Sequence, residues 1–264
     1  MAIEYRWGYD ESGRLPELAA DLSKPAGDCH GDTGQHSRGS CGESRDRDHS
    51  DCVYEWRHPV RAGLVVSLNR PGGNVTGISS MNFGLEAKRL ELLHQLLHRD
   101  ARIAVLVNPS NSQPQSVITD LQAAASAMGR QLEILTATTN RDISPAFSDA
   151  VRRRADAMLI SADPLFTNHP AQLAILAARH AMPTIYGFRE FAEVGGLMSY
   201  GASQTEAYRH AGTYTGRILK GEKPADLPIL QATKFEFVVN MRTAEALGID
   251  VPPTLLAIAD EVFE

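Results

Sequence analysis

Polar side chains with hydrogen-bonding capacity recur where the apolar runs of this sequence end. Three such stretches, residues 108–112, 161–167 and 187–190, are rich in Asn, Ser, Asp and Thr, and Phe166, Tyr186 and Phe188 stand within or beside them. Polar groups that orient a small molecule, set next to aromatic faces, suit an organic ligand of modest size. Each stretch taken singly is also what ordinary turn chemistry produces. The three together favour a ligand-binding site.

The sequence lacks the patterns that nucleophilic or phosphate chemistry requires. The glycine-rich stretch 70–77 (RPGGNVTG) has neither the G-x-G-x-x-G spacing nor a following Gly-Lys-Ser/Thr, so we interpret it as a tight turn that places Thr76 near the ligand. No G-x-S-x-G elbow supplies a hydrolase nucleophile. Asp163 has no second carboxylate or nucleophile near it in the sequence. We therefore expect a binding protein, with no enzymatic activity and no cofactor.

Two groups of residues have the chemistry of metal ligands. His94 and His98 lie one helical turn apart, but in a Leu-rich stretch this spacing is more typical of a partly exposed helix face. The other group has no C-x-x-C and no H-x-x-x-H spacing, and consists of Cys29, His30, His36, Cys41, His49, Cys52 and His58. The sequence therefore predicts no metal site.

Charge and hydropathy exclude further classes. The chain has 264 residues and a formal net charge of -6, which argues against a nucleic-acid partner because phosphate binding needs clustered Lys and Arg. No stretch approaches the roughly 18 consecutive apolar residues that a membrane span needs. Residues 1–10 lack the charged-then-apolar layout of an export signal. The chain as written is thus expected to stay in the cytoplasm and to span no membrane.

The composition changes abruptly near the front. Residues 23–52 contain no Val, Ile, Leu, Met, Phe, Trp or Tyr and hold all three cysteines. Such a segment cannot bury enough apolar surface to offset the entropy of ordering it. Residues 23–58 are therefore predicted to be disordered or to be read in a shifted frame. With codons chosen to suit, the nucleotides that encode residues 37–56, read one base out of frame, could encode an alanine-rich helix followed by a buried strand.

Strands and helices alternate regularly after Pro59. Short apolar runs ending in turn residues predict strands at 102–107, 131–135, 157–160, 184–186, 197–200 and 235–240. Helical spacing predicts helices at 117–128, from a cap at Asp142 through 151, and at 171–180, 205–219 and 243–248. This alternation indicates an α/β fold with a parallel sheet and crossover helices. In such sheets the ligand crevice lies at the carboxyl ends of the strands.

The sequence resembles the ABC-transporter substrate-binding proteins of the tryptophan/tyrosine-binding type. The likeness runs almost unbroken from residue 59 to 264 and again over residues 3–22. It is carried by residues 59–65 (PVRAGLV), 69–77 (NRPGGNVTG), 87–93 (AKRLELL), 107–109 (VNP), 162–164 (ADP), 195–201 (GGLMSYG), 218–228 (ILKGEKPADLP), 246–248 (ALG) and 251–253 (VPP).

The resemblance implies a type I periplasmic-binding fold of two α/β lobes joined by crossing strands. Mapped onto this sequence, residues 1–82 and 196–264 form an incomplete first lobe and residues 83–195 the second lobe. Ligand held between the lobes is then delivered to the permease subunits of a bacterial importer, and the family location is the periplasm. An amino acid or aromatic compound is the expected ligand.

The candidate ligand contacts follow from strand-end position. We expect them at Thr76, Ser79, Asn108, Ser110, Asn111, Ser161, Asp163, Phe166 and Tyr186, with Asp163 facing a ligand ammonium group and Tyr186 as a stacking wall. Three alternatives stay open. They are a cytoplasmic ligand-sensing domain of the same fold, an enzyme acting on sugars or nucleotides, and a non-functional truncated product.

Overall fold

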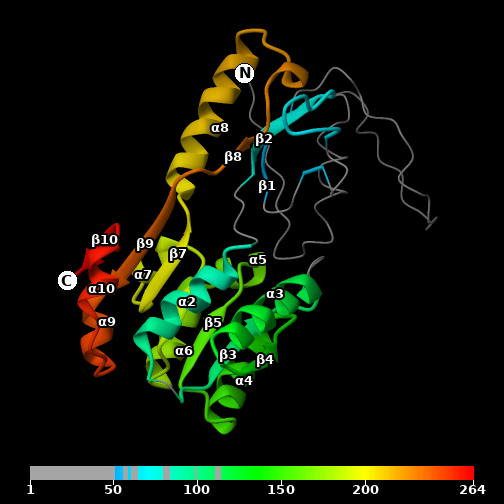
Figure 1. Ribbon diagram of the computed structural model, residues 1–264. Helices are drawn as coiled ribbons and strands as arrows, with labels where there is room; N and C mark the ends of the chain where they lie inside the picture. The colour runs from blue at the N-terminus through cyan, green and yellow to red at the C-terminus, as the bar shows by residue number, and fades with distance from the viewer. Residues whose placement is uncertain (1–50, 56–58, 61–64, 80–83, 99, 111–113) are drawn as a thin grey trace, which may run out of the picture.

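The computed structural model describes residues 51–55, 59–60, 65–79, 84–98, 100–110 and 114–264 (Figure 1). Seven strands of the described chain form one sheet in the order β10-β9-β7-β6-β5-β3-β4. They are β3 (Ile103–Val107), β4 (Leu132–Thr136), β5 (Ala157–Ile160), β6 (Thr184–Tyr186), β7 (Met198–Ala202), β9 (Phe235–Asn240) and β10 (Glu261–Phe263). The strands from β3 to β7 pair in parallel, whereas β9 runs antiparallel to β7. The predicted α/β class with a mainly parallel sheet is confirmed.

Helices cover both faces of this sheet. They are α2 (Glu86–Leu96), α3 (Pro114–Ala127), α4 (Asn140–Arg152), α5 (Pro164–Thr167), α6 (Pro170–Arg179), α7 (Arg189–Glu193), α9 (Met241–Ala246) and α10 (Pro253–Ala257). The alternation of side chains along β3 divides the core into two layers. Ala104 and Leu106 pack with α4, α6 and α7, and Ile103, Val105 and Val107 pack with α2 and α3. Burial on both faces explains why the strands are nearly continuous apolar runs.

A second, smaller sheet lies apart from the first (Figure 1). Its order is β1-β2-β8, all parallel, and its strands are β1 (Asp51–Glu55), β2 (Val75–Ser79) and β8 (Leu230–Gln231). Helix α8 (Gln204–Leu219) packs against β1 and β2, and the 3-10 helix η2 (Pro224–Asp226) contacts β2. The two sheets with their helices are called the small lobe and the large lobe below.

From β1 onward, the elements that the structure describes alternate between the lobes three times. The first crossing leads from β2 to α2, the second from β7 to α8, and the third from β8 to β9. The second and third crossings lie side by side, because the Ser203 backbone N–H donates to the Lys234 carbonyl at 3.1 Å and Ala202 pairs with Phe235. Short connecting segments at the ends of strands and helices are where hinges between lobes are found, because a few such residues absorb the changes in φ and ψ.

The sheets divide the chain differently from the expected lobe boundaries. Residues 196–264 were assigned to the first lobe, yet β7, β9 and β10 all belong to the seven-stranded sheet of the large lobe. The reason is backbone pairing, since β7 joins β6 in parallel and β9 returns antiparallel along β7 over five residue pairs. Of the C-terminal stretch, residues 204–231 supply the helices and strand of the small lobe.

Two local expectations are corrected. Residues 51–55 belong to the stretch predicted to be disordered or out of frame, and disorder is contradicted because they form β1, which pairs with β2 over five positions. Val53 and Tyr54 are residue types that favour strands. The shifted reading frame stays a prediction. Residues 1–50 and 56–58 lie outside the described residues. Asp142 was expected to precede helix α4. It lies instead in the first turn, where its carboxylate accepts the backbone N–H groups of Thr138 and Thr139 at 3.0 and 2.8 Å.

Candidate ligand-binding site

The carboxyl ends of β3, β5 and β6 lie at one edge of the large-lobe sheet. These strands are parallel and adjacent in the order β6-β5-β3, so the segments that follow them emerge together. Those segments begin at Asn108, Ser161 and Gly187. The structure therefore places the three polar stretches singled out in the sequence at a common edge, where parallel α/β sheets bind their ligands.

A hydrogen bond joins two of these segments. The Asn108 side-chain amide donates to Asp163 Oδ1 at 3.0 Å. The same carboxylate oxygen accepts the Leu165 backbone N–H at 2.8 Å and so caps α5. The side-chain oxygen of Asn108, Oδ1, accepts the Ser110 backbone N–H at 3.0 Å. Asn108, Ser110 and Asp163 thus form one connected polar group that holds both segments in place.

The members of this edge differ in their access to solvent. Ser110 is exposed and Asn108 half-buried, whereas Ser161 and Asp163 are buried, with Asp163 only 3% exposed. The Ser161 backbone N–H continues the sheet by donating to the Leu106 carbonyl at 3.0 Å. Asn111 lies outside the described residues. Ser110 and Asn108 are therefore the predicted contacts that a solute reaches most directly in this arrangement.

Phe166 and Tyr186 occupy the core below that edge. Phe166 is 1% exposed and Tyr186 fully buried, and both belong to the layer that packs under α4, α6 and α7. The Tyr186 ring stacks on Phe191, with centroids 4.5 Å apart and planes at 11°. Burial raises the pKa of its phenol, and the Thr184 side chain opposes that effect. In this arrangement the ring stacks on a core phenylalanine.

Thr76 and Ser79 lie on β2 in the small lobe. Thr76 is fully buried, and its hydroxyl donates to the Leu227 carbonyl at 2.7 Å, which ties β2 to the segment before β8. Ser79 ends the strand and is 5% exposed, and its carbonyl accepts the Ala232 N–H at 3.0 Å. Ser79 therefore stands where the first and third crossings leave the small lobe, whereas Thr76 lies three residues earlier in β2, beside the segment that precedes β8.

Sequence reasoning missed a buried ion pair close to the crossings. Arg89 and Glu86 lie one turn apart on α2, and their side chains are 0% and 3% exposed. Arg89 Nη1 is 3.2 Å from Glu86 Oε1. The signal that was available is weak, because residues 85–93 (LEAKRLELL) hold Glu86 and Arg89 together with a second charged pair at the same spacing, Lys88 and Glu91. That pattern also fits an exposed helix face, so it did not identify a buried pair.

The histidines considered as metal ligands have another role. His94 Nδ1 accepts a hydrogen bond from Arg130 Nε at 3.0 Å, and the guanidinium of Arg130 also donates to the carbonyls of Ala101 and His98. Burial, and then the nearby Arg130, lower the pKa of His94. Within the described ranges no group of three His, Cys, Asp or Glu side chains could hold a metal ion. The histidine and cysteine ligands of residues 1–50 lie outside them.

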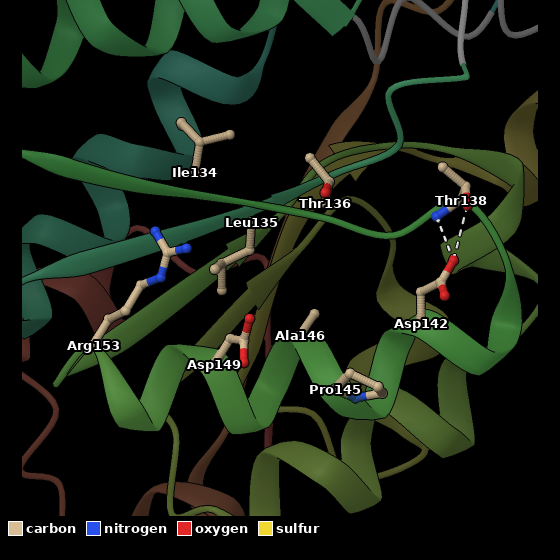
Figure 2. Close-up of a pocket in the computed structure, with 9 residues that line it drawn as sticks. All are labelled: Ile134, Leu135, Thr136, Thr138, Asp142, Pro145, Ala146, Asp149 and Arg153. Atoms are coloured by element: carbon tan, nitrogen blue, oxygen red, sulfur yellow. Dashed lines mark hydrogen bonds between the residues drawn. The ribbon is translucent and has the colours of Figure 1, made fainter.

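A pocket of about 390 Å³ opens between β4 and α4 (Figure 2). Asp149 and Arg153 reach towards it from the C-terminal half of α4, and Asp142 and Thr138 are joined by hydrogen bonds at its other end. β4 is the edge strand of the sheet. None of the nine residues that line this pocket is a predicted ligand contact.

No helix in the described part of the chain is both long enough and apolar enough to cross a bilayer.

Comparisons with known proteins agree with this architecture. Residues 54–263 match the family described as ABC transporter substrate binding protein. The chain is 26% identical over 191 residues to the tyrosine-binding protein of Clostridioides difficile, which is 72% of this chain and 54% of that protein. It therefore spans about half the length of this curated relative.

Two solved structures share the fold. The ABC domain from Streptococcus pneumonia in complex with L-Trp has a TM-score of 0.71 and 26% identity, covering 82% of this chain and 74% of that one. A conserved domain protein from Vibrio cholerae has a TM-score of 0.68 and 27% identity, covering 78% and 68%. The fold predicted from the resemblance is thereby confirmed.

The family match covers most of the sequence, including both lobes as the structure describes them. Its members are solute-binding proteins and not enzymes. The chain belongs to the ABC transporter substrate-binding protein family.

Proposed function

We propose that this protein binds a free amino acid between its lobes, with L-Trp and L-Tyr as the first candidates, as the solute-binding component of a bacterial ABC importer. The observation that carries the proposal is the connected group of Asn108, Ser110 and Asp163 at the strand-end edge. Support for the ligand class comes from the relatives, one of which is a tyrosine-binding protein and another a complex with L-Trp.

The polar group offers chemistry suited to an amino acid. A primary amide has two N–H donors, and Asn108 directs one of them to Asp163, which leaves the second for a ligand carboxylate. The exposed Ser110 hydroxyl is a second donor at the same edge. The Asp163 carboxylate supplies the negative charge that attracts a ligand ammonium group. Ser161 and Asn111 complete the large-lobe contacts in this proposal, and Thr76 and Ser79 lie on the small-lobe side.

Phe166 and Tyr186 have a supporting role in this proposal. Because both rings are buried in the core, they support the strand-end segments from below through packing. A ligand that touches both lobes favours the closed arrangement over the open one, since its affinity for the two arrangements differs. The closed form would then be recognised by permease subunits, and the place of action would be the periplasm.

Isothermal titration calorimetry of the purified chain with L-Trp and L-Tyr tests the proposal. We expect saturable binding of at least one of them, and no binding of tryptamine, which lacks the carboxylate. Asp163→Asn keeps the shape of the side chain and removes its charge. It should weaken binding about ten- to a hundredfold, the range of a hydrogen bond to a charged group. Asp120→Asn, on the exposed surface of α3, is the matched control and should bind like the wild type. Absence of heat and of any thermal shift with all twenty standard amino acids would overturn the proposal.

A further inference from the structure

The Arg89 side chain reaches from α2 to β7, the strand that leads into the second crossing. Its Nε donates to the Tyr200 carbonyl at 2.7 Å, and Tyr200 lies in β7, three residues before Ser203, the residue that caps α8. The guanidinium is fully buried, and its Nη1 is 3.2 Å from Glu86 Oε1. Arg89 therefore fixes the strand that carries the chain out of the large lobe.

Glu86 extends the same connection to the first crossing. Its Oε2 accepts the backbone N–H of Gly84 at 2.8 Å. Gly84 has φ +99°, a left-handed conformation in which a side chain would be strained, and it stands where the chain enters the large lobe before α2. The contacts from Gly84 through Glu86 and Arg89 to Tyr200 thus link the point where the chain enters the large lobe before α2 to β7, the strand that leads into the second crossing.

The guanidinium also lies against the strand-end edge. A Cβ atom added at Gly187, which follows β6, would lie 3.3 Å from Arg89 Nη2 and 3.5 Å from the Cβ of Ala162, which follows β5. The same side chain therefore packs beside the segments that carry the candidate ligand contacts. A movement of the crossings that shifts Arg89 would therefore also displace the segments that carry the candidate ligand contacts.

Burying this pair costs desolvation free energy, which the attraction between the two charges often does not exceed. Burial lowers the pKa of Arg89, and Glu86 opposes that effect. Buried ion pairs are often no more stabilising than apolar residues of the same volume, and their best-documented role is to fix one arrangement among several. Lys88 and Glu91 have the same spacing on the same helix but are 41% and 48% exposed. The same spacing on this helix is thus compatible with an exposed ion pair, so the burial of Glu86 and Arg89 is not a consequence of the spacing.

We propose that the Glu86–Arg89 pair is a positioning unit that fixes the angle between the two lobes, by tying the first crossing to the second, and thereby sets the affinity of the strand-end site. The inference deepens the proposed function and rests on it for the nature of the ligand. The geometry of the crossings themselves is independent of the ligand.

Two variants separate positioning from stability. Arg89→Met removes the bond to Tyr200 and leaves the Glu86 carboxylate buried, so it should also lower the melting temperature. The double variant Glu86→Leu/Arg89→Met replaces the pair with apolar groups and should recover the melting temperature without recovering the tie between the crossings. Arg89→Lys keeps the charge but cannot hold the two directed bonds together, so it should lie between the wild type and Arg89→Met.

Two controls match these variants. Arg130→Met removes another buried arginine of the large lobe, one that bonds to His94, Ala101 and His98 away from the crossings. Lys88→Met removes the exposed charge from the same helix as Arg89. Arg130→Met should lower the melting temperature and leave the lobe angle unchanged, and Lys88→Met should change neither.

The measurements are small-angle X-ray scattering of the full chain and calorimetric affinity, both well below the melting temperature. In the double variant we expect a larger radius of gyration without ligand, and a dissociation constant for L-Trp or L-Tyr raised at least about fivefold, the lower end of typical coupling between sites. A radius of gyration equal to that of the wild type, together with unchanged affinity, would refute the positioning role. If the wild type binds neither amino acid, the proposed function fails, while the comparison of unliganded radii still decides the role of the pair.

Discussion

Asn108 and Asp163 are separated by 55 residues in the sequence and by 3.0 Å in the structure, where the amide of one donates to the carboxylate of the other. This single bond connects the ends of two neighbouring parallel strands, β3 and β5. Its carboxylate also caps a short helix. One side chain therefore organises both segments at the proposed ligand edge.

Asp163→Ala should destabilise the fold as well as the site. The change leaves the Leu165 N–H without its cap and removes the acceptor of the Asn108 amide, and caps of this kind are worth about 0.5–2 kcal/mol. Urea denaturation should therefore show a loss of about 1–2 kcal/mol in the free energy of unfolding. Asp120→Ala on the surface of α3 should stay within about 0.5 kcal/mol of the wild type. Equal stability of the two variants would contradict the capping role.

Gly196→Ala should be among the most damaging small substitutions in the large lobe. A Cβ there would lie 2.7 Å from both the Phe191 carbonyl oxygen and Tyr186 Cε2, two groups held in a packed core. Overpacking of this kind costs about 1–3 kcal/mol. Thermal unfolding is the measurement.

Gly212→Ala is the matched comparison for that substitution. Gly212 lies within α8, and a Cβ there meets nothing within 4 Å. Because alanine favours helix over glycine, the variant should be more stable by about 0.5–1 kcal/mol. A loss of stability in Gly212→Ala would mean that the outer face of α8 is covered in solution.

The burial of His94, together with the nearby charge of Arg130, predicts a dependence of stability on pH. Folding lowers the pKa of His94 below its ordinary value of 6.5, so the unfolded chain takes up the proton first as the pH falls. The stabilisation linked to neutral His94 is therefore complete above pH 6.5 and is lost as the pH falls through the lower pKa of the folded state. Unfolding of wild type and His94→Gln should be compared at pH 8 and pH 5. The difference between them should shrink at the lower pH, and a constant difference would refute the link.

Asp142 predicts a second pH dependence at more acid values. Hydrogen bonds from the side chain and backbone N–H of Thr138, and then from those of Thr139, lower the pKa of its carboxyl from 3.8 to about 2 (Figure 2). A depressed carboxyl pKa stabilises the folded state above the unfolded value, and that contribution disappears as the pH falls from 3.8 towards 2. Carboxyl NMR titration of wild type against Asp142→Asn would give this pKa directly. A value near 3.8 would mean that the bonds to Thr138 and Thr139 do not persist in solution.

Local periodicity was sufficient to locate most elements of the large lobe. The predicted bounds of β5, β6 and β9 match the structure, because each is a short apolar run bounded by polar or turn residues. The short helices α5, α7 and α10 and the strand β10 were not predicted. Helices of four or five residues span little more than one turn, so they cannot display a helical period. Strand β10 (EVF) begins with a glutamate and is therefore not an apolar run.

Sheet membership was beyond the reach of the sequence pattern. β7 reads as a strand in either lobe, and only its pairing with Ile185 and Tyr186 on one side and with β9 on the other assigns it to the large lobe. Such pairings are long-range, and alternation along the chain does not encode them. The lobe boundary at residue 196 was therefore placed by analogy and differs from the sheets.

In the candidate site, too, features set by the local sequence were predicted and features set by tertiary packing were not. Strand-end position correctly brought Asn108, Ser110 and Asp163 to one edge. It could not separate Arg89 from Lys88, neighbours that each face a glutamate three residues away on the same helix. What distinguishes the two is whether β7 covers the helix face, which depends on the tertiary fold.

The three passages of the chain between the lobes make neither lobe a contiguous fragment. A protease that cut the polypeptide once, in one of the crossings, would leave the two lobes covalently connected through the other two crossings. The nicked protein would therefore elute as one particle from a sizing column and separate into pieces only in detergent. Neither lobe could be expressed from one uninterrupted stretch of the gene. A mechanical force that pulls the two lobes apart would be divided among the three connecting segments.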